Sequence, residues 1–174
     1  MWHATLALVF ACLAVPVHAQ CPWKDDGDLA TGLSDSQWLI TGDRHWLING
    51  GSMQIQPTPY QRSLTIGALL REVQLDGVSY DLRLIAPISD EDLIQNMGRN
   101  TVSFPMPALP TGECGDLGLS DISISGPAEL AGQQAQAILV LRPDTPDHFV
   151  GVLRVLKSFG ARDVLIGQIE MTRR

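Results

Sequence analysis

The side chains most able to carry out chemistry in this sequence are two histidines, His45 and His148, the only ones beyond residue 19. His148 follows Asp144 and Asp147, and a carboxylate beside an imidazole is a usual arrangement for general acid–base catalysis. Neither histidine is accompanied by a Gly-x-Ser-x-Gly nucleophile elbow. The three neighbouring residues could also ligate a metal ion, but Asp147 after Pro146 equally fits the first turn of a helix. We therefore expect polar turn residues with at most a binding role, and no cofactor or metal.

Tryptophans form the second group of candidates. Trp23, Trp38 and Trp46 all lie in the N-terminal half of the chain. Indole rings stack on flat apolar ligands, so Trp38 and Trp46 are candidate residues for binding a sugar or cell-wall fragment. The alternative, which we prefer, is that these rings complete the core of a small β-rich layer.

The N-terminal segment has the pattern of a secretory signal peptide. Residues 1–19 contain no Lys, Arg, Asp or Glu, and an almost unbroken apolar run ends in Val17-His18-Ala19, which resembles a signal-peptidase site. The usual Lys or Arg before the apolar run is missing. Cleavage after Ala19 would leave a periplasmic or secreted protein that begins at Gln20. An uncleaved membrane anchor and a lipid attached to Cys12 are the alternatives.

Removal of this segment changes the cysteine count. Of the three cysteines, Cys12 would leave with the signal peptide, and Cys21 and Cys114 would remain. An even pair in an oxidising compartment predicts a disulfide, which here would join the mature N-terminus to the middle of the chain. The sequence has no Cys-x-x-Cys spacing, so a redox or zinc role is not expected.

Composition excludes several classes of protein. The chain has 174 residues, is 45% hydrophobic and carries a net charge of −7. This apolar content is too high for a disordered chain, and the negative charge does not suit a protein that binds nucleic-acid phosphates. No apolar run beyond the leader approaches the roughly 20 residues of a membrane-spanning helix. We expect no membrane span in the mature chain and no nucleic-acid partner.

Hydrophobic periodicity predicts alternating short strands and helices. We expect an α+β protein with a two-layer mixed sheet, helices on one face and a C-terminal β-α-β unit. The predicted organisation is a signal peptide at 1–19, an N-terminal β-rich α/β region at 20–104, a Pro/Gly-rich loop at 105–118 and the β-α-β region at 119–174. The predicted strands are 38–40, 45–48, 52–56, 78–85, 101–104, 119–125, 137–141 and 164–169, the first two paired as a hairpin, and the predicted helices are 64–73, 90–97 and 149–159.

The β-α-β unit is the most strongly patterned part of the chain. An apolar run at 137–141 predicts a buried strand, and Thr145 and Pro146 occupy the positions of a helix cap and first helical residue. Apolar residues then recur at helical spacing from Phe149 to Phe159, and Gly160 stands where a helix-terminating glycine belongs. A strand at 164–169 would complete a right-handed crossover.

This unit resembles the periplasmic domain of the ExbD/TolR family. The similarity lies in the strand Ile138-Leu139-Val140-Leu141, the Asp144-Thr145-Pro146 turn, the predicted helix and the closing Gly160-Ala161-Arg162-Asp163-Val164, with Val102-Ser103-Phe104-Pro105 matching the start of that region. The family carries an acidic residue in its transmembrane helix for proton-driven energy transduction, and the apolar leader here contains none. The resemblance therefore implies a fold and a binding role in biopolymer transport, without the transducing chemistry.

We expect an exported, non-enzymatic binding or accessory protein whose partner is an envelope protein or a cell-wall component. Two alternatives remain at this point. One is a secreted cell-wall- or carbohydrate-binding module that uses the tryptophans, and the other is a small secreted hydrolase that uses His45 or His148.

Overall fold

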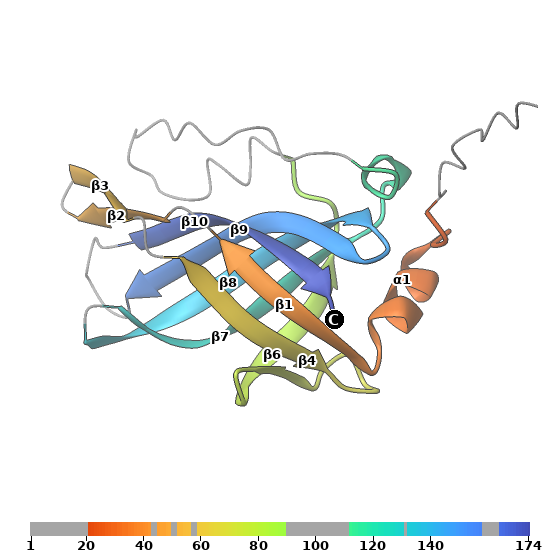
Figure 1. Cartoon of the computed structure of the whole chain (residues 1–174), viewed down its shortest axis with the longest axis horizontal. Coiled ribbons are helices and arrows are strands. Elements are labelled where there is room, and N and C mark those ends of the chain that lie inside the picture. The colour runs from red at the N-terminus through yellow and green to blue at the C-terminus, as the bar shows by residue number, and fades with distance from the viewer. Residues whose placement is uncertain are drawn as a thin grey trace, which may run out of the picture.

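The computed structural model describes residues 21–42, 45–49, 52–56, 59–89, 112–130, 132–157 and 164–174, with side chains omitted for 45–49, 52–56 and 164–166 (Figure 1). These residues contain one α-helix, one short 3-10 helix and ten strands. In chain order the elements are α1 (Asp26–Leu33), β1 (Ser36–Gly42), β2 (His45–Asn49), β3 (Ser52–Gln56), β4 (Tyr60–Ile66), β5 (Val73–Leu75), β6 (Val78–Ile85), η1 (Gly115–Leu117), β7 (Asp121–Leu130), β8 (Gln133–Thr145), β9 (His148–Lys157) and β10 (Val164–Arg173).

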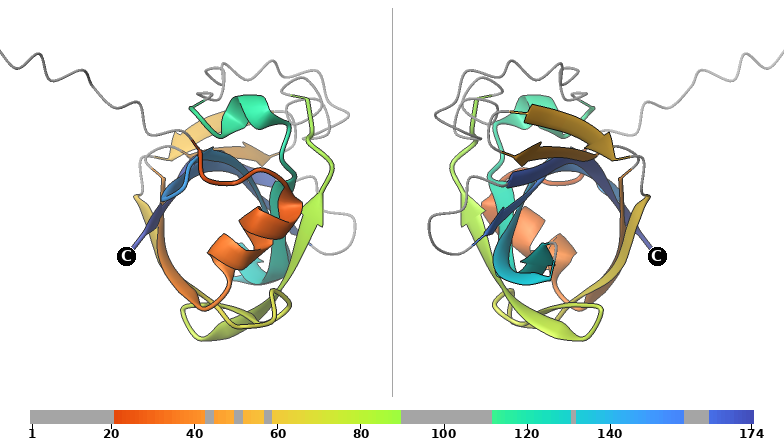
Figure 2. Two further views of the ribbon diagram at one scale, coloured as in Figure 1. Left: turned by 90° about the vertical axis from the view of Figure 1, so that its right-hand side faces the viewer. Right: turned by 90° about the vertical axis from the view of Figure 1, so that its left-hand side faces the viewer.

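Eight of the strands close into an antiparallel barrel. Their order is β1-β4-β5-β6-β7-β8-β9-β10, and β1 pairs with β10 to complete the ring. The β2–β3 hairpin continues the sheet from the edge of β10. Figure 2 shows the strands as a closed ring. The predicted α+β fold, a mixed two-layer sheet with helices on one face, is therefore wrong: every strand pair is antiparallel, and the sheet closes on itself.

The hydrophobic core lies inside the barrel. Side chains alternate along β8, where buried and more exposed positions follow each other from Ala135 to Pro143. Because side chains along a strand alternate between its two faces, each barrel strand has one face that points inward. The fully buried inward side chains include Trp38, Ile40, Leu64, Ile66, Ile122, Ile124, Leu139, Leu141, Phe149, Leu153, Ile169 and Met171.

Helix α1 covers one end of the barrel (Figure 2). The Asp25 side chain caps its N-terminus by accepting hydrogen bonds from the backbone N–H groups of Gly27 at 2.8 Å and Asp28 at 3.0 Å. Leu29 and Leu33 are fully buried and belong to the barrel core. We call this the closed end of the barrel, because the helix places apolar side chains across it.

A carboxylate joins this helix to the barrel and predicts a pH effect. Asp26 accepts hydrogen bonds from the backbone N–H of Ser120 at 2.9 Å and from its hydroxyl at 2.7 Å, and these bonds lower the pKa of Asp26 below 3.8. A lowered folded-state pKa adds stability that is present above pH 3.8 and is lost as the pH falls through the folded-state value.

We therefore expect Asp26→Asn to destabilise the protein by about 0.5 kcal/mol at pH 7, since solvent screens this exposed carboxylate, and by much less near pH 2. Thermal unfolding at both pH values measures the difference from the native chain. The exposed Asp116 provides the matched control, Asp116→Asn, which should change stability little at either pH. An equal loss of stability at both pH values would contradict the proposed role of the Asp26 charge.

Strand β9 replaces the helix predicted at 149–159, so the predicted β-α-β unit is wrong. β8 and β9 form a hairpin in which Thr145 pairs with His148 around Pro146-Asp147, where the sequence predicts the start of a helix. Both faces of β9 are apolar, because Val150 and Val152 are buried as well as the inward residues. The sequence of β9 therefore lacks the apolar–polar alternation of a half-buried strand. Its apolar residues also recur at helical spacing, which is why the sequence predicts a helix.

Other predicted elements differ as well. The helix predicted at 64–73 is divided between β4, a turn and β5. The strands predicted at 38–40 and 45–48 exist in β1 and β2, but they do not pair as a hairpin: β1 pairs with β4 and β10, and β2 with β3 and β10. The strand predicted at 78–85 is β6. The predictions for 1–19, 90–97, 101–104 and most of 105–118 lie outside the described residues.

Candidate functional site

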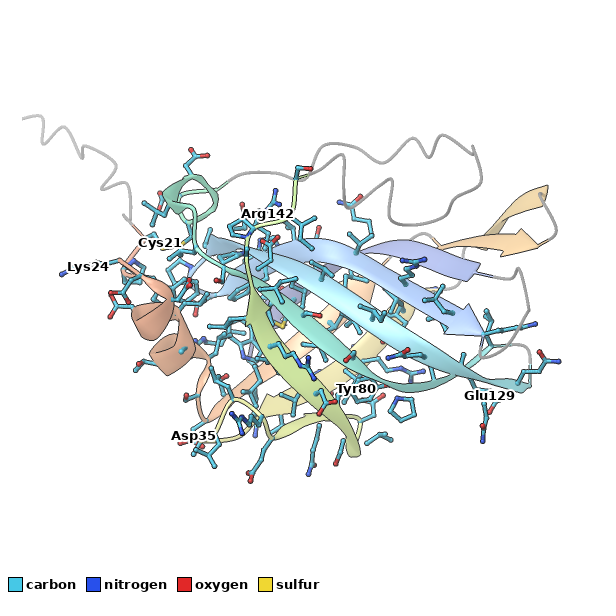
Figure 3. The ribbon with its side chains drawn as sticks, turned by 180° about the vertical axis from the view of Figure 1, so that it is seen from behind. Cys21, Lys24, Asp35, Tyr80, Glu129 and Arg142 are labelled. Atoms are coloured by element: carbon cyan, nitrogen blue, oxygen red, sulfur yellow. A yellow bond between two sulfur atoms is a disulfide. The ribbon has the colours of Figure 1, made fainter. Side chains whose placement is uncertain are left out.

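A cavity of about 750 Å³ occupies the half of the barrel away from α1. It is bounded by side chains from β4, the β5–β6 hairpin, β7, β8 and β9, near the end at which β7 finishes and β8 begins. Figure 3 shows Glu129 at this end and Cys21 at the opposite one. We call the end that contains Glu129 the open end of the barrel. The apolar part of the lining consists of Pro59, Leu75, Val78, Pro127, Ala128, Leu130, Ala137, Leu153 and Val155.

The cavity exists because the inward residues of two adjacent strands change in size along the barrel axis. In the closed half, β7 and β8 contribute Ile122, Ile124, Leu139 and Leu141. In the open half, the inward positions on the same two strands are Gly126, Ala128, Ala137 and Ala135. Large side chains fill the interior of an eight-stranded barrel, and small ones leave space for a ligand. Sequence reasoning missed this cavity; small residues at every second position of paired strands are the signal that could have revealed it.

Two tyrosines supply polar groups to the cavity. The ring of Tyr80 lies against Gly126, where an added Cβ would be 2.4 Å from the tyrosine Cδ1. The Tyr80 hydroxyl donates a hydrogen bond to the carbonyl oxygen of Pro127 at 2.6 Å. Burial raises the pKa of Tyr60 to about 12 and also raises the pKa of Tyr80. Both hydroxyl groups are therefore neutral at physiological pH.

The ion pair between Arg62 and Asp76 lies beside these tyrosines. Nη1 of Arg62 lies 3.2 Å from Oδ2 of Asp76, and the Arg62 guanidinium carbon lies 5.5 Å from the centroid of the Tyr60 ring. Asp76 and Gly77 form the two-residue turn between β5 and β6, with φ of 49° and 81°. Positive φ at both positions is typical of a type I′ hairpin turn.

The residues singled out around His148 lie at the closed end, away from the cavity. Nδ1 of His148 is 2.8 Å from Oδ2 of Asp144, and Nε2 is 3.6 Å from Oε2 of Glu170. Asp147 instead pairs with Arg173, with Oδ1 2.9 Å from Nε. The structure thus brings Asp144 and His148 together. Across the described residues, no group of three or more His, Cys, Asp or Glu side chains is arranged to hold a metal ion.

Trp38 is part of the closed-end core. Its side chain is fully buried, and its ring meets that of Phe149 edge to face, with centroids 5.3 Å apart. Its indole N–H donates to the Ser36 hydroxyl at 2.7 Å, and the guanidinium carbon of Arg173 lies 4.7 Å from its centroid. Trp46 and His45 belong to β2, whose side chains lie outside the description. Trp38 therefore contributes to packing, while the roles of Trp46 and His45 stay predictions.

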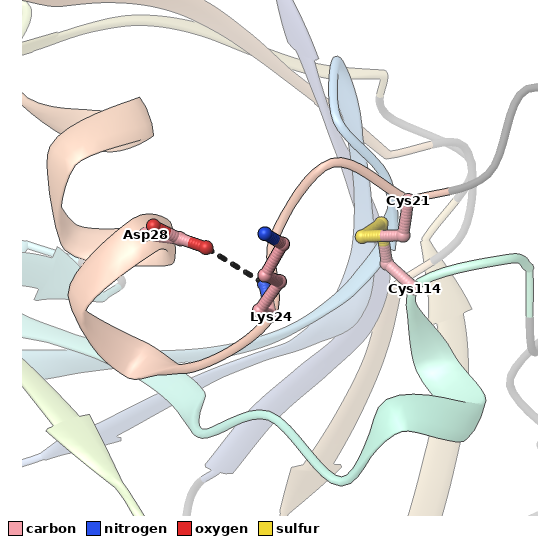
Figure 4. Close-up of a disulfide and its surroundings, with 4 residues drawn as sticks. All are labelled: Cys21, Lys24, Asp28 and Cys114. Atoms are coloured by element: carbon pink, nitrogen blue, oxygen red, sulfur yellow. Dashed lines mark hydrogen bonds between the residues drawn. A yellow bond between two sulfur atoms is a disulfide. The ribbon is translucent and has the colours of Figure 1, made fainter.

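The predicted disulfide is confirmed. Cys21 and Cys114 are bonded across a sequence separation of 93 residues (Figure 4). The bond joins the segment before α1 to the segment that contains η1. Cys114 is fully buried, and its backbone N–H donates to the carbonyl oxygen of Asp144 at 3.0 Å. The disulfide therefore holds the segment that precedes α1 against the closed end of the barrel.

The fold and the cavity define a class: an eight-stranded antiparallel barrel, closed by a helix at one end and hollow toward the other. Comparison with protein-family models, curated proteins and solved structures finds no match in any of the three. Within the described ranges, no helix is long and apolar enough to cross a membrane. The ExbD/TolR resemblance stays a prediction from sequence, and the helix that contributed to it is strand β9.

Proposed function

We propose that this protein is an exported, non-enzymatic binding protein that holds a small, mostly apolar molecule in the open half of its barrel. The cavity of about 750 Å³ carries this proposal. Ligand pockets in proteins typically have volumes of about 300–1,000 Å³, an apolar lining and a few polar groups that orient the ligand. Eight-stranded barrels are also just wide enough to hold one small ligand.

The chemistry of the lining favours binding over catalysis. Its described residues include no Ser, Cys or His, so they offer no nucleophile paired with an imidazole base. The polar groups present are two neutral tyrosines, an arginine already paired with an aspartate, Gln61 and Glu129. Such groups can orient a bound molecule by hydrogen bonds.

Export is supported by the disulfide. Disulfides form and persist in oxidising compartments such as the periplasm and the extracellular space, and are rare in the cytosol. The bond between Cys21 and Cys114 therefore agrees with the secretory pattern of residues 1–19. A protein or cell-wall partner in the envelope remains a separate prediction, based on the family resemblance alone.

Filling the cavity tests the proposal. We expect the native chain to bind the uncharged fluorescent probe N-phenyl-1-naphthylamine, and Ala137→Phe to weaken that binding at least about tenfold, because the new ring would occupy the ligand space. Ala137→Leu, a smaller change, should weaken binding less. Fluorescence titration measures the Kd, and circular dichroism checks the fold of each variant.

The matched control is Gln136→Phe, which adds the same ring one residue away. Gln136 is exposed and faces outward on β8, so this variant should bind the probe like the native chain. A native chain that does not bind the probe would contradict the proposal. So would folded Ala137→Phe and Ala137→Leu variants that bind it with unchanged affinity.

A further inference from the structure

We propose that the ligand is an uncharged amphiphile, an apolar chain or ring with one oxygen-bearing polar end, and that Asp76 sets this selectivity by neutralising Arg62. The inference rests on the proposed function, since it names the ligand class of the same cavity.

Arg62 is the only cation among the described residues of the cavity lining. Its guanidinium is already engaged from two sides: Asp76 lies 3.2 Å from Nη1, and the Tyr60 ring lies under the guanidinium carbon at 5.5 Å. The two acidic side chains of the lining are Asp76 and Glu129. The charges at this end therefore balance or are slightly negative, and no excess positive charge is offered to an incoming anion.

Asp76 holds its position independently of Arg62. Its Oδ1 accepts a hydrogen bond from the backbone N–H of Ser63 at 2.9 Å, and its own N–H donates to the carbonyl oxygen of Ser63 at 2.9 Å. The type I′ turn with Gly77 fixes its backbone further. The carboxylate therefore keeps its place beside the guanidinium when a ligand enters.

These contacts disfavour both charged types of ligand. A carboxylate head would have to compete with Asp76 for Arg62, whose side chains are 43% and 52% exposed, and would be repelled by the carboxylates of Asp76 and Glu129. An ammonium head would lose its hydration against the apolar lining, and because Asp76 is already paired with Arg62, only Glu129 would be left to compensate its charge. A hydroxyl or carbonyl head avoids both costs. It can exchange hydrogen bonds with the tyrosine hydroxyls, and the Tyr80 oxygen can accept one because its proton goes to Pro127.

A matched series of ten-carbon ligands tests the inference. At pH 7.5, 1-decanol, decanoate and decylammonium each compete with N-phenyl-1-naphthylamine for the full native chain. We expect decanol to bind at least about tenfold more tightly than either charged ligand. Decanoate or decylammonium binding as tightly as decanol would overturn the inference while leaving the proposed function standing. A probe that does not bind at all would overturn both.

Asp76→Asn tests the assigned residue. Its amide oxygen can still accept the Ser63 N–H, so the turn should be kept, while Arg62 loses its counter-charge. We expect decanoate to gain about three- to fivefold relative to decanol, since the side chains of Arg62 and Asp76 are 52% and 43% exposed and solvent screens their charges. The gain should disappear in Asp76→Asn/Arg62→Gln, since the cation is then absent.

Asp81→Asn is the matched control, because Asp81 is an exposed residue on the neighbouring strand β6 and does not line the cavity. It should keep the native preference for decanol. An unchanged preference in folded Asp76→Asn would overturn the role of Asp76, and so would an equal gain in Asp81→Asn.

Discussion

Replacing Cys21 and Cys114 together by serine is expected to lower the free energy of unfolding by about 2–5 kcal/mol. The bond closes a separation of 93 residues, for which the chain-entropy model predicts a contribution of about 4–5 kcal/mol. In the reduced chain, the segment before α1 would lose its covalent link to the closed end of the barrel. The Tm should fall by roughly 5–15 °C, which differential scanning calorimetry would measure.

The experiment needs a background without other thiols. Both the disulfide-bonded protein and the double-serine variant should carry Cys12→Ser, so that no third cysteine can exchange with the bond. A reducing agent should lower the Tm of the disulfide-bonded protein and leave that of the double-serine variant unchanged. A loss of stability below about 1 kcal/mol would show that the bond constrains the unfolded chain far less than its loop length predicts.

Asp121→Ala is expected to destabilise the protein by about 3–5 kcal/mol, because it leaves one half of a buried ion pair without its partner. The Asp121 side chain is about 1% exposed, and its Oδ1 lies 3.2 Å from Nε of Arg142. Its Oδ2 accepts the backbone N–H of Ile88 at 2.9 Å, and the Arg142 guanidinium donates to the Ile88 carbonyl oxygen. The carboxylate therefore joins β7, β8 and the segment after β6, all of which would lose a contact.

The control for this variant lies on the adjacent strand. Asp81→Ala removes a carboxylate from an exposed position of β6 and should change stability by no more than about 0.5 kcal/mol. Urea unfolding followed by tryptophan fluorescence measures both variants, since Trp38 lies in the core. Asp121→Ala within about 1 kcal/mol of the native chain would mean that the guanidinium and the Ile88 N–H are solvated in the folded state, contrary to the burial seen here.

The residues with the clearest chemical patterns in the sequence are the ones that stabilise the closed end. Around the β8–β9 hairpin, Asp144 contacts His148 and Asp147 pairs with Arg173, and Trp38 fills the core beside Phe149. Polar residues in a tight turn and aromatic residues in a strand are common for structural reasons, so their types alone do not reveal a binding site. The cavity is instead lined by small apolar residues with no reactive groups, such as Ala128 and Ala137.

Some features could be predicted because they depend on residues close in sequence or on simple counting. The strand at 78–85 shows alternation in its sequence, and the cysteine pair follows from the even count that remains when the predicted signal peptide is set aside. The segment at 149–159 shows the limit of this approach. Its apolar spacing fits a helix, but its three valines are accommodated in a strand buried on both faces.

The sequence by itself determined the strand at 78–85, which cysteines pair and which positions carry small or large side chains. Only the tertiary structure decided that β9 is a strand, that β1 and β10 meet to close the ring, and that the small residues of β7 and β8 face one space. The physical reason is that these outcomes depend on hydrogen bonds and packing between segments far apart in the chain. Such contacts override local propensity, and no short window of sequence contains them.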